Sequence, residues 1–271
     1  MLGKTEGIIL RTVDYGEGNK ILTVFTKEMG KVGMMARGAR KSKSRLSAVS
    51  QPFILAHFVF QIGSGMGSLS QAEIINAFPK IRLDLYRTAY AAYLLELTER
   101  FTEERRRSLI LYELLLALLN QVEQGKDPEI LARIFELKIL SMNGYKPYIE
   151  GCASCHTGGS PWFFSIREGG LLCSNCRYKD PHAIVLGESV PRLLQLFLHV
   201  NVAQVGNIKV KEITKRQLEK VLHLFMDEYA GVRLKSRNFL QQLTQMEEII
   251  PRKEMDHGDE RRSSSEERGM D

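Results

Sequence analysis

The sequence lacks any long hydrophobic run. Its most apolar stretch, residues 109–120, is interrupted by Glu113, whereas a membrane-spanning helix needs about 20 consecutive apolar residues. The first residues, MLGKTEGIILRTVDYGEG, have no apolar segment of the kind found in a secretory signal. These absences predict a cytoplasmic protein with no membrane partner.

Recognisable enzyme motifs are missing as well. The chain has no Walker A loop, no complete GxGxxG motif, no His-x-Glu deaminase pattern and no GxSxG elbow. The glycines in YGEGNK are better explained by a tight hairpin turn, and the paired acids Glu103 and Glu104 by solvated ion pairs with Arg105–Arg107. We therefore expect a protein that is not an enzyme.

Cysteine is scarce: the four residues of this type are confined to one short segment. Two Cys-x2-Cys pairs, Cys152 with Cys155 and Cys173 with Cys176, are separated by a spacing typical of zinc sites. Four thiolates would complete a tetrahedral site and leave no position open for water or substrate. The pattern predicts one structural Zn²⁺ per chain, held in a β-ribbon that turns at Gly169 and Gly170.

Two other interpretations of the cysteines remain open. Cys152-Ala-Ser-Cys155-His156 has the spacing of a c-type haem attachment site, but this would leave the second pair without a role. A thioredoxin-like redox pair would lack the βαβ surroundings that its chemistry uses, and disulfides would conflict with the reducing compartment that we expect. His156 is an alternative ligand, although its position next to Cys155 favours a solvent-facing residue or a hydrogen-bond donor to a ligand.

Acidic residues are absent between Glu28 and Glu73, where the chain carries six cations. Five of these cations lie within RGARKSKSR, a stretch with the glycine and serine content of a loop. Such a concentration of charge attracts polyanions, and nucleic acid is the commonest of them. We predict a phosphate-binding loop rather than a merely mobile one, formed by Arg37, Arg40, Lys41, Lys43 and Arg45.

The first eighty residues contain five short strand-like segments separated by glycine turns. This arrangement suits a small closed barrel, and the OB-fold is such a barrel that commonly binds single-stranded nucleic acid. Tyr15 is the aromatic residue most suited to stacking on a base, whereas Phe25, Phe58 and Phe60 are better explained as barrel core.

Beyond Pro79 the apolar residues recur at three- and four-residue spacing, which predicts helices. Asp127 and Pro128 form a helix start, and Gly125 and Gly144 form helix ends. The fold class is therefore α+β: an N-terminal five-stranded OB-fold barrel, then an α-helical domain with an inserted four-cysteine zinc ribbon. The expected divisions are 1–80 for the barrel, 81–148 and 180–248 for the helices, 149–179 for the ribbon and 249–271 for a disordered tail.

The order of these motifs resembles the RecO family of bacterial recombination mediator proteins. The resemblance is carried by GIILRTVDYGEGNKILTVFTKEMGKVGMMARGARKSKSR, by GYKPYIEGCASC and by LKSRNFL, and it covers the chain up to about residue 246. It implies an OB-fold, a zinc ribbon and binding to single- and double-stranded DNA. It also implies a basic surface that includes Lys235 and Arg237, although cations near a helix end are common for electrostatic reasons alone.

The family's partners follow from the same resemblance. RecO-like proteins anneal complementary strands, bind the C-terminal tail of the single-stranded DNA-binding protein SSB and, with RecR, help to load RecA. They would be cytoplasmic and associated with the nucleoid during repair. Another OB-fold zinc protein that binds RNA or ribosomes is the alternative, and a zinc nuclease is disfavoured because no cluster of acids is present to hold a divalent metal ion.

Overall fold

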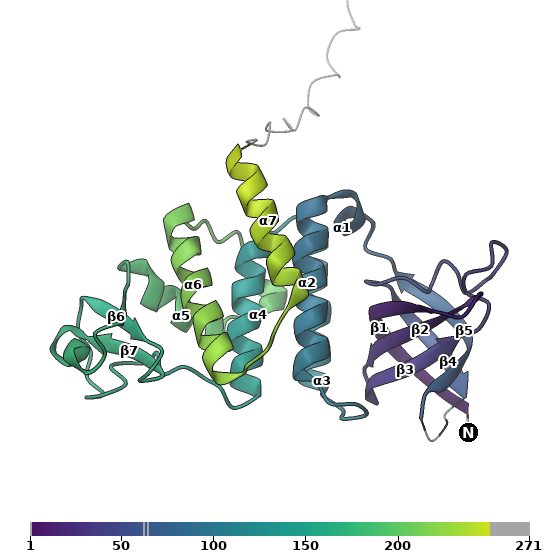
Figure 1. The fold of residues 1–271 in the computed structure, drawn as a ribbon, viewed down its shortest axis with the longest axis horizontal. Coiled ribbons are helices and arrows are strands. Elements are labelled where there is room, and N and C mark those ends of the chain that lie inside the picture. Colours follow the sequence, from purple (N-terminus) through teal and green to yellow (C-terminus); the bar gives the residue numbers. More distant parts are fainter. Residues whose placement is uncertain (1, 62, 64, 250–271) are drawn as a thin grey trace, which may run out of the picture.

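The computed structural model describes residues 2–61, 63 and 65–249, and Figure 1 shows three parts in a row. A β-barrel lies at one end, a small β-ribbon lies at the other, and helices fill the space between them. The tail predicted for residues 249–271 lies outside the described residues, apart from Ile249 at the end of α7. No helix in the described part of the chain is long and apolar enough to span a membrane.

The barrel has the strand order β1-β2-β3-β5-β4, and β1 also pairs with β4, so the sheet closes on itself. All pairs are antiparallel except β3 with β5, which pair in parallel at Met34 and Met35. This order confirms the predicted OB-like barrel. The strands are Leu2–Tyr15 (β1), Asn19–Thr26 (β2), Gly30–Ala36 (β3), Leu55–Gln61 (β4) and Gly67–Asn76 (β5).

Alternation of side chains along the strands builds two separate apolar surfaces. Phe58 and Phe60 point into the barrel and belong to its core, as expected. Phe25 is equally buried, but it belongs to the core of the helical part and lies 6.0 Å from the ring of Tyr112. The expectation of barrel core was therefore wrong for Phe25, because this wall of the barrel is covered by helices that lie far away in the sequence.

One helix start and two helix ends lie where the local signals predicted them. The Asp127 carboxylate accepts hydrogen bonds from the backbone N–H groups of Glu129 and Ile130 at the start of α4. Gly125 and Gly144, with φ of 89° and 84°, follow the ends of α3 and α4 in the left-handed region. The helices are Pro79–Leu83 (α1), Leu85–Phe101 (α2), Leu109–Glu123 (α3), Pro128–Met142 (α4), Ser189–His199 (α5), Glu212–Tyr229 (α6) and Lys235–Ile249 (α7).

The ribbon is inserted between α4 and α5, and its two faces have different roles. Phe164 and Leu171 point toward the helices and are fully buried in their core, whereas Phe163 and Leu172 pack with three of the four cysteines. The ribbon extends beyond residue 179, where we expected it to end, because a third strand pairs with β6. This strand has only two residues, which is too short to produce a recognisable sequence pattern. The strands are Trp162–Ser165 (β6), Gly170–Cys173 (β7) and Ile184–Val185 (β8).

Candidate nucleic-acid interface and metal centre

The predicted phosphate-binding loop is the connection between β3 and β4. We call residues 37–54 the cationic loop. Its apolar residues Ala39 and Val49 are buried in the barrel core, and tight turns such as Lys41 N–H to the Gly38 carbonyl order its backbone. The five predicted cations are all exposed: Arg37, Arg40, Lys41, Lys43 and Arg45.

The cationic loop is held against the hairpin that joins β1 to β2. Asn19 accepts a hydrogen bond from the Gly38 N–H at 2.9 Å, and the Arg40 backbone N–H donates to the Gly18 carbonyl at 3.1 Å. The Arg40 guanidinium also donates to the Gly16 carbonyl, and its Nε lies 3.3 Å from a carboxylate oxygen of Asp14. These contacts place the cations beside Tyr15, a residue that is 55% exposed next to the turn.

Four of the five cations face the solvent without an ionic partner. Only Arg40 has a carboxylate within ion-pair distance among the residues that the structure describes. Because a surface pair of this kind contributes little free energy, Arg40 is still free to exchange Asp14 for a phosphate. The tip of the barrel therefore carries a net positive charge, with five exposed cations of the cationic loop against Asp14 and Glu17 of the hairpin, and it has one exposed aromatic ring, Tyr15.

Lys235 and Arg237 lie in a different setting at the start of α7. Glu96 accepts hydrogen bonds from the backbone N–H groups of Lys235 and Ser236 and so caps this helix, which leaves the Lys235 side chain exposed. Arg237 instead donates to both carboxylate oxygens of Asp227, at 2.7 and 2.8 Å, and its side chain is only 13% exposed. The first residue is thus available to a ligand, whereas the second is engaged within the protein.

A cleft of about 530 Å³ connects Lys235 with the barrel. Pro52 and Phe53, at the end of the cationic loop, line this cleft together with Lys235. Two further cations line the cleft, Arg11 from β1 and Arg100 from α2, and no local sequence pattern links them. Arg11 lies 2.9 Å from Glu99, so its charge is partly balanced.

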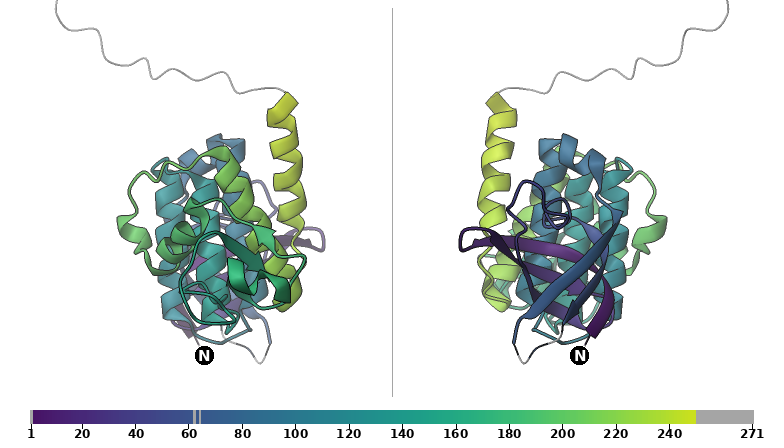
Figure 2. Two further views of the ribbon diagram at one scale, coloured as in Figure 1. Left: turned by 90° about the vertical axis from the view of Figure 1, so that its left-hand side faces the viewer. Right: turned by 90° about the vertical axis from the view of Figure 1, so that its right-hand side faces the viewer.

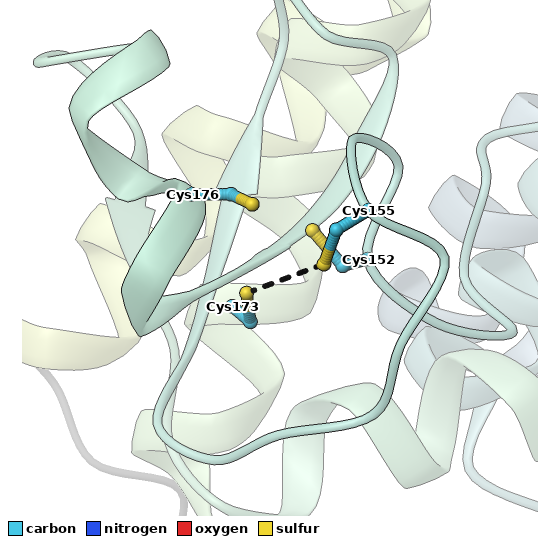
Figure 3. Close-up of side chains that lie close together, drawn as sticks. All are labelled: Cys152, Cys155, Cys173 and Cys176. Atoms are coloured by element: carbon cyan, nitrogen blue, oxygen red, sulfur yellow. Dashed lines mark hydrogen bonds between the residues drawn. The ribbon is translucent and has the colours of Figure 1, made fainter.

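The four cysteines converge in the ribbon (Figure 3), and their sulfur atoms all lie within 4.8 Å of one another. Cys152 and Cys155 come from the loop after α4, Cys173 ends β7, and Cys176 lies in the 3₁₀ helix Ser174–Lys179 (η1). The sulfurs of Cys155 and Cys173 are 3.8 Å apart. A tetrahedral thiolate site with metal–sulfur bonds of about 2.3 Å has edges of about 3.8 Å, so this geometry fits a metal ion.

Hydrogen bonds favour the thiolate forms of Cys152 and Cys155. The Thr157 hydroxyl, 2.9 Å from the sulfur of Cys155, lowers the pKa of Cys155 to about 6. Burial works to raise the pKa of Cys152, but backbone N–H groups from Cys155, Cys173 and Ser154 outweigh it and lower that pKa. The pKa of Cys176 is instead raised to about 11, because a hydrogen bond from Ser154 is outweighed by burial and by hydrogen bonds with the other three sulfur atoms. Several thiolates this close together repel one another, and a metal cation among them removes that repulsion.

His156 does not belong to the cluster of sulfur atoms. Its backbone has a φ of 61°, and its exposed ring lies edge-on to the ring of Tyr148 at 5.3 Å. The group of metal-binding side chains found among the described residues consists of the four cysteines alone. This agrees with the expectation that His156 is a solvent-facing neighbour of the site.

The barrel, the cationic loop and the ribbon define a class: an OB-barrel protein with an exposed positive surface and a four-cysteine metal centre. Residues 1–78 match the family model described as Recombination protein O N terminal, and residues 82–238 match the one described as Recombination protein O C terminal. The chain belongs to the RecO family of DNA repair proteins.

Individual relatives agree with this assignment over nearly their whole length. The chain is 47% identical to DNA repair protein RecO of Bacillus mycoides over 243 residues, which cover 90% of this chain and 98% of the relative. It is 47% identical to DNA repair protein RecO of Halalkalibacterium halodurans over 246 residues, 91% of this chain and 97% of the relative.

Proposed function

We propose that this protein is a recombination mediator that binds single- and double-stranded DNA and anneals complementary strands. With RecR, it would help to load RecA onto single-stranded DNA that is coated by SSB. The observation that carries the proposal is the cationic loop, with four unpaired cations beside Tyr15 at the tip of an OB-like barrel in the described part of the chain. Lys235, which faces the adjoining cleft, would extend the DNA contact, and Arg237 would do so only after releasing Asp227.

The chemistry of annealing requires no bond to be made or broken by the protein. Cations that neutralise phosphates reduce the repulsion between two strands, and base pairing then supplies the specificity. Stacking of a base on Tyr15 would hold the strand without a sequence preference. We therefore propose a mediator that acts by binding rather than by catalysis.

The metal that we propose for the four cysteines is Zn²⁺. Four thiolates in a tetrahedral arrangement suit this ion, and they leave no open position for substrate. The ion would hold η1 and the loop after α4 together and would take no part in chemistry.

Among the proposed protein partners, SSB is the one whose binding is supported by a surface groove of suitable chemistry. A hollow of about 930 Å³ between the ribbon and α5 has Trp162, Leu193 and Leu196 among its apolar lining residues. Its lining also carries three exposed cations, Arg192, Lys209 and Lys211. This combination would accept the acidic, apolar C-terminal tail of SSB.

The test is annealing of complementary oligonucleotides coated with cognate SSB. A variant with alanine at the five predicted cations of the cationic loop is compared with wild type. A charge-matched control replaces five exposed cations elsewhere: Lys4, Lys80, Arg107, Lys220 and Arg233. We expect wild type and control to anneal and the loop variant to fail. The salt dependence of single-strand binding by the loop variant should fall by about 0.7 for each phosphate that the protein no longer neutralises.

Other outcomes would change the proposal in defined ways. Equal annealing by all three proteins would move the DNA site away from the cationic loop. Binding to RNA with the same affinity and no annealing of DNA would favour the OB-fold RNA-binding alternative. Cleavage of a labelled oligonucleotide during incubation with the protein and Mg²⁺ would contradict the non-catalytic mechanism.

A further inference from the structure

The ribbon carries a second exposed tyrosine between cations, at the opposite end of the molecule from the barrel. In η1, Tyr178 is 76% exposed, and its neighbours Arg177 and Lys179 are exposed too. Neither cation has an ion-pair partner within the part of the chain that the structure describes. The same local chemistry as at the barrel tip, an open ring flanked by unbalanced positive charge, is thus present twice.

Acidic residues are scarce in the segment around η1. From Gly169 to Gly187 the sequence contains a single acid, Asp180, and its side chain is buried. Its carboxylate accepts hydrogen bonds from the Ser165 hydroxyl at 2.5 Å and from the His182 backbone N–H at 3.0 Å. The negative charge of Asp180 is therefore held inside the ribbon, and the outer surface of η1 is positive.

The backbone that presents these side chains is fixed. Cys173 immediately precedes η1 and Cys176 lies within it, so two of the four sulfur atoms of the metal centre anchor this short helix. The Arg177 guanidinium lies over the ring of Phe163, 4.9 Å from its centroid, which orients the side chain while leaving it exposed. A preorganised cation loses little conformational entropy when it binds a ligand.

The geometry points to a second contact site for single-stranded DNA on η1, in which a base stacks on Tyr178 while Arg177 and Lys179 bind the flanking phosphates. This inference rests on the proposed function for the nature of its ligand. Stacking on an open aromatic face is tolerant of base identity, and the two cations supply the electrostatic contribution. An acidic peptide is a poorer fit, because Tyr178 stands out in solvent and does not form the floor of a groove.

Because this site lies away from the barrel, it can bind a segment of DNA that the barrel does not contact. The ribbon and the barrel lie at opposite ends of the long axis in Figure 1, and the two end-on views in Figure 2 show each of them facing outward. Two separated sites allow one molecule to hold two strands, or two segments of one strand, at the same time. Binding by two sites on one molecule raises the local concentration of the second strand near the first.

Photocrosslinking with an oligonucleotide that contains 5-iododeoxyuridine tests the contact directly, using the full chain with its metal. Mass spectrometry of the crosslinked peptides is expected to identify both Tyr15 and Tyr178. In parallel, anisotropy measures the binding of a long oligo(dT) by Tyr178→Ala and by the double variant Arg177→Ala/Lys179→Ala. Matched controls are Tyr145→Ala, another exposed tyrosine, and Lys220→Ala/Arg233→Ala.

We expect Tyr178→Ala to weaken binding about fivefold or more, and the double variant to lower the salt slope by about 1.4. Controls with unchanged affinity and unchanged metal content would complete the support. A crosslink at Tyr15 alone, with ribbon variants that bind like wild type, would overturn this inference and leave the proposed function intact. If wild type neither crosslinks to the oligonucleotide nor binds DNA, the proposed function itself is refuted.

Discussion

At the scale of single residues, a buried cluster of charged and polar side chains joins α2, α4 and α6. Arg133 and Glu136, both fully buried, form an ion pair with 3.1 Å between Nη2 and Oε1, and the Tyr93 hydroxyl donates to the same carboxylate at 2.5 Å. Arg133 Nη1 lies 2.9 Å from Nε2 of His223. Burial, with a further contribution from the Arg133 charge, lowers the pKa of His223 and keeps its ring neutral.

Removal of one charge from this cluster is predicted to be far more harmful than removal of both. Glu136→Leu leaves the Arg133 guanidinium buried without its counter-ion, so we expect a loss of about 3 to 5 kcal/mol in the free energy of unfolding. The double variant Arg133→Met/Glu136→Leu buries no uncompensated charge and should recover most of that loss. Urea unfolding of the three proteins measures the difference, and a double variant less stable than Glu136→Leu would contradict this account.

The ribbon is the element that depends most on its ligands. Its own small core consists of Phe163, Leu172 and Ala183 together with three of the four cysteines. These few apolar side chains, even with Phe164 and Leu171 buried against the helices, offset only part of the conformational entropy of ordering some thirty residues, at about 1 to 2 kcal/mol for each residue. The free energy of metal binding must therefore supply much of the stability of this element.

Metal removal is accordingly expected to disorder the ribbon while the barrel stays folded. Cys155→Ser, or treatment with a strong chelator, should raise amide hydrogen exchange across residues 150–186 and leave β1 to β5 protected. Ser174→Ala, at an exposed position of η1, serves as the control that keeps all four thiols. Ribbon amides that remain protected in metal-free protein would show that packing against α6 suffices without the metal.

At the scale of the whole molecule, the barrel is fixed to the helices by backbone pairing. The loop between α2 and α3 adds to the edge of β3, where the Arg105 N–H donates to the Lys31 carbonyl at 2.9 Å. The Lys31 ammonium donates to the carbonyl groups of Glu99 and Thr102 in the same region. A barrel held in this way cannot turn freely, so the cationic loop and Lys235 keep a common orientation around their cleft.

Gly30 is the residue that permits this close approach. It has a φ of 70°, and a Cβ atom there would lie 2.1 Å from the Arg106 carbonyl oxygen. We predict that Gly30→Ala lowers the melting temperature more than Gly16→Ala does. Gly16 also has a positive φ, of 59°, but a Cβ atom added there would have no heavy atom within 4 Å. The control carries only the left-handed backbone cost of about 1 to 2 kcal/mol. Equal melting temperatures for the two variants would show that the junction yields without cost.

The sequence by itself determined the strands, the helices and the four-thiol site. Strand alternation and glycine turns predicted the barrel, three- and four-residue spacing predicted the helices, and the two Cys-x2-Cys pairs predicted a four-thiol site that the sulfur positions confirm. These features depend on neighbours along the chain, within a turn, a strand or a hairpin. Their physical causes can therefore be read from the order of the residues.

Only the tertiary structure decided which distant residues meet. Phe25 packs on Tyr112 and not inside the barrel, Arg237 is paired with Asp227, and Tyr178 stands exposed at the end opposite Tyr15. Each of these outcomes depends on how separate elements pack against one another, and burial and charge pairing follow from that packing. A sequence pattern records which face of an element is apolar, but it does not record which other face will cover it.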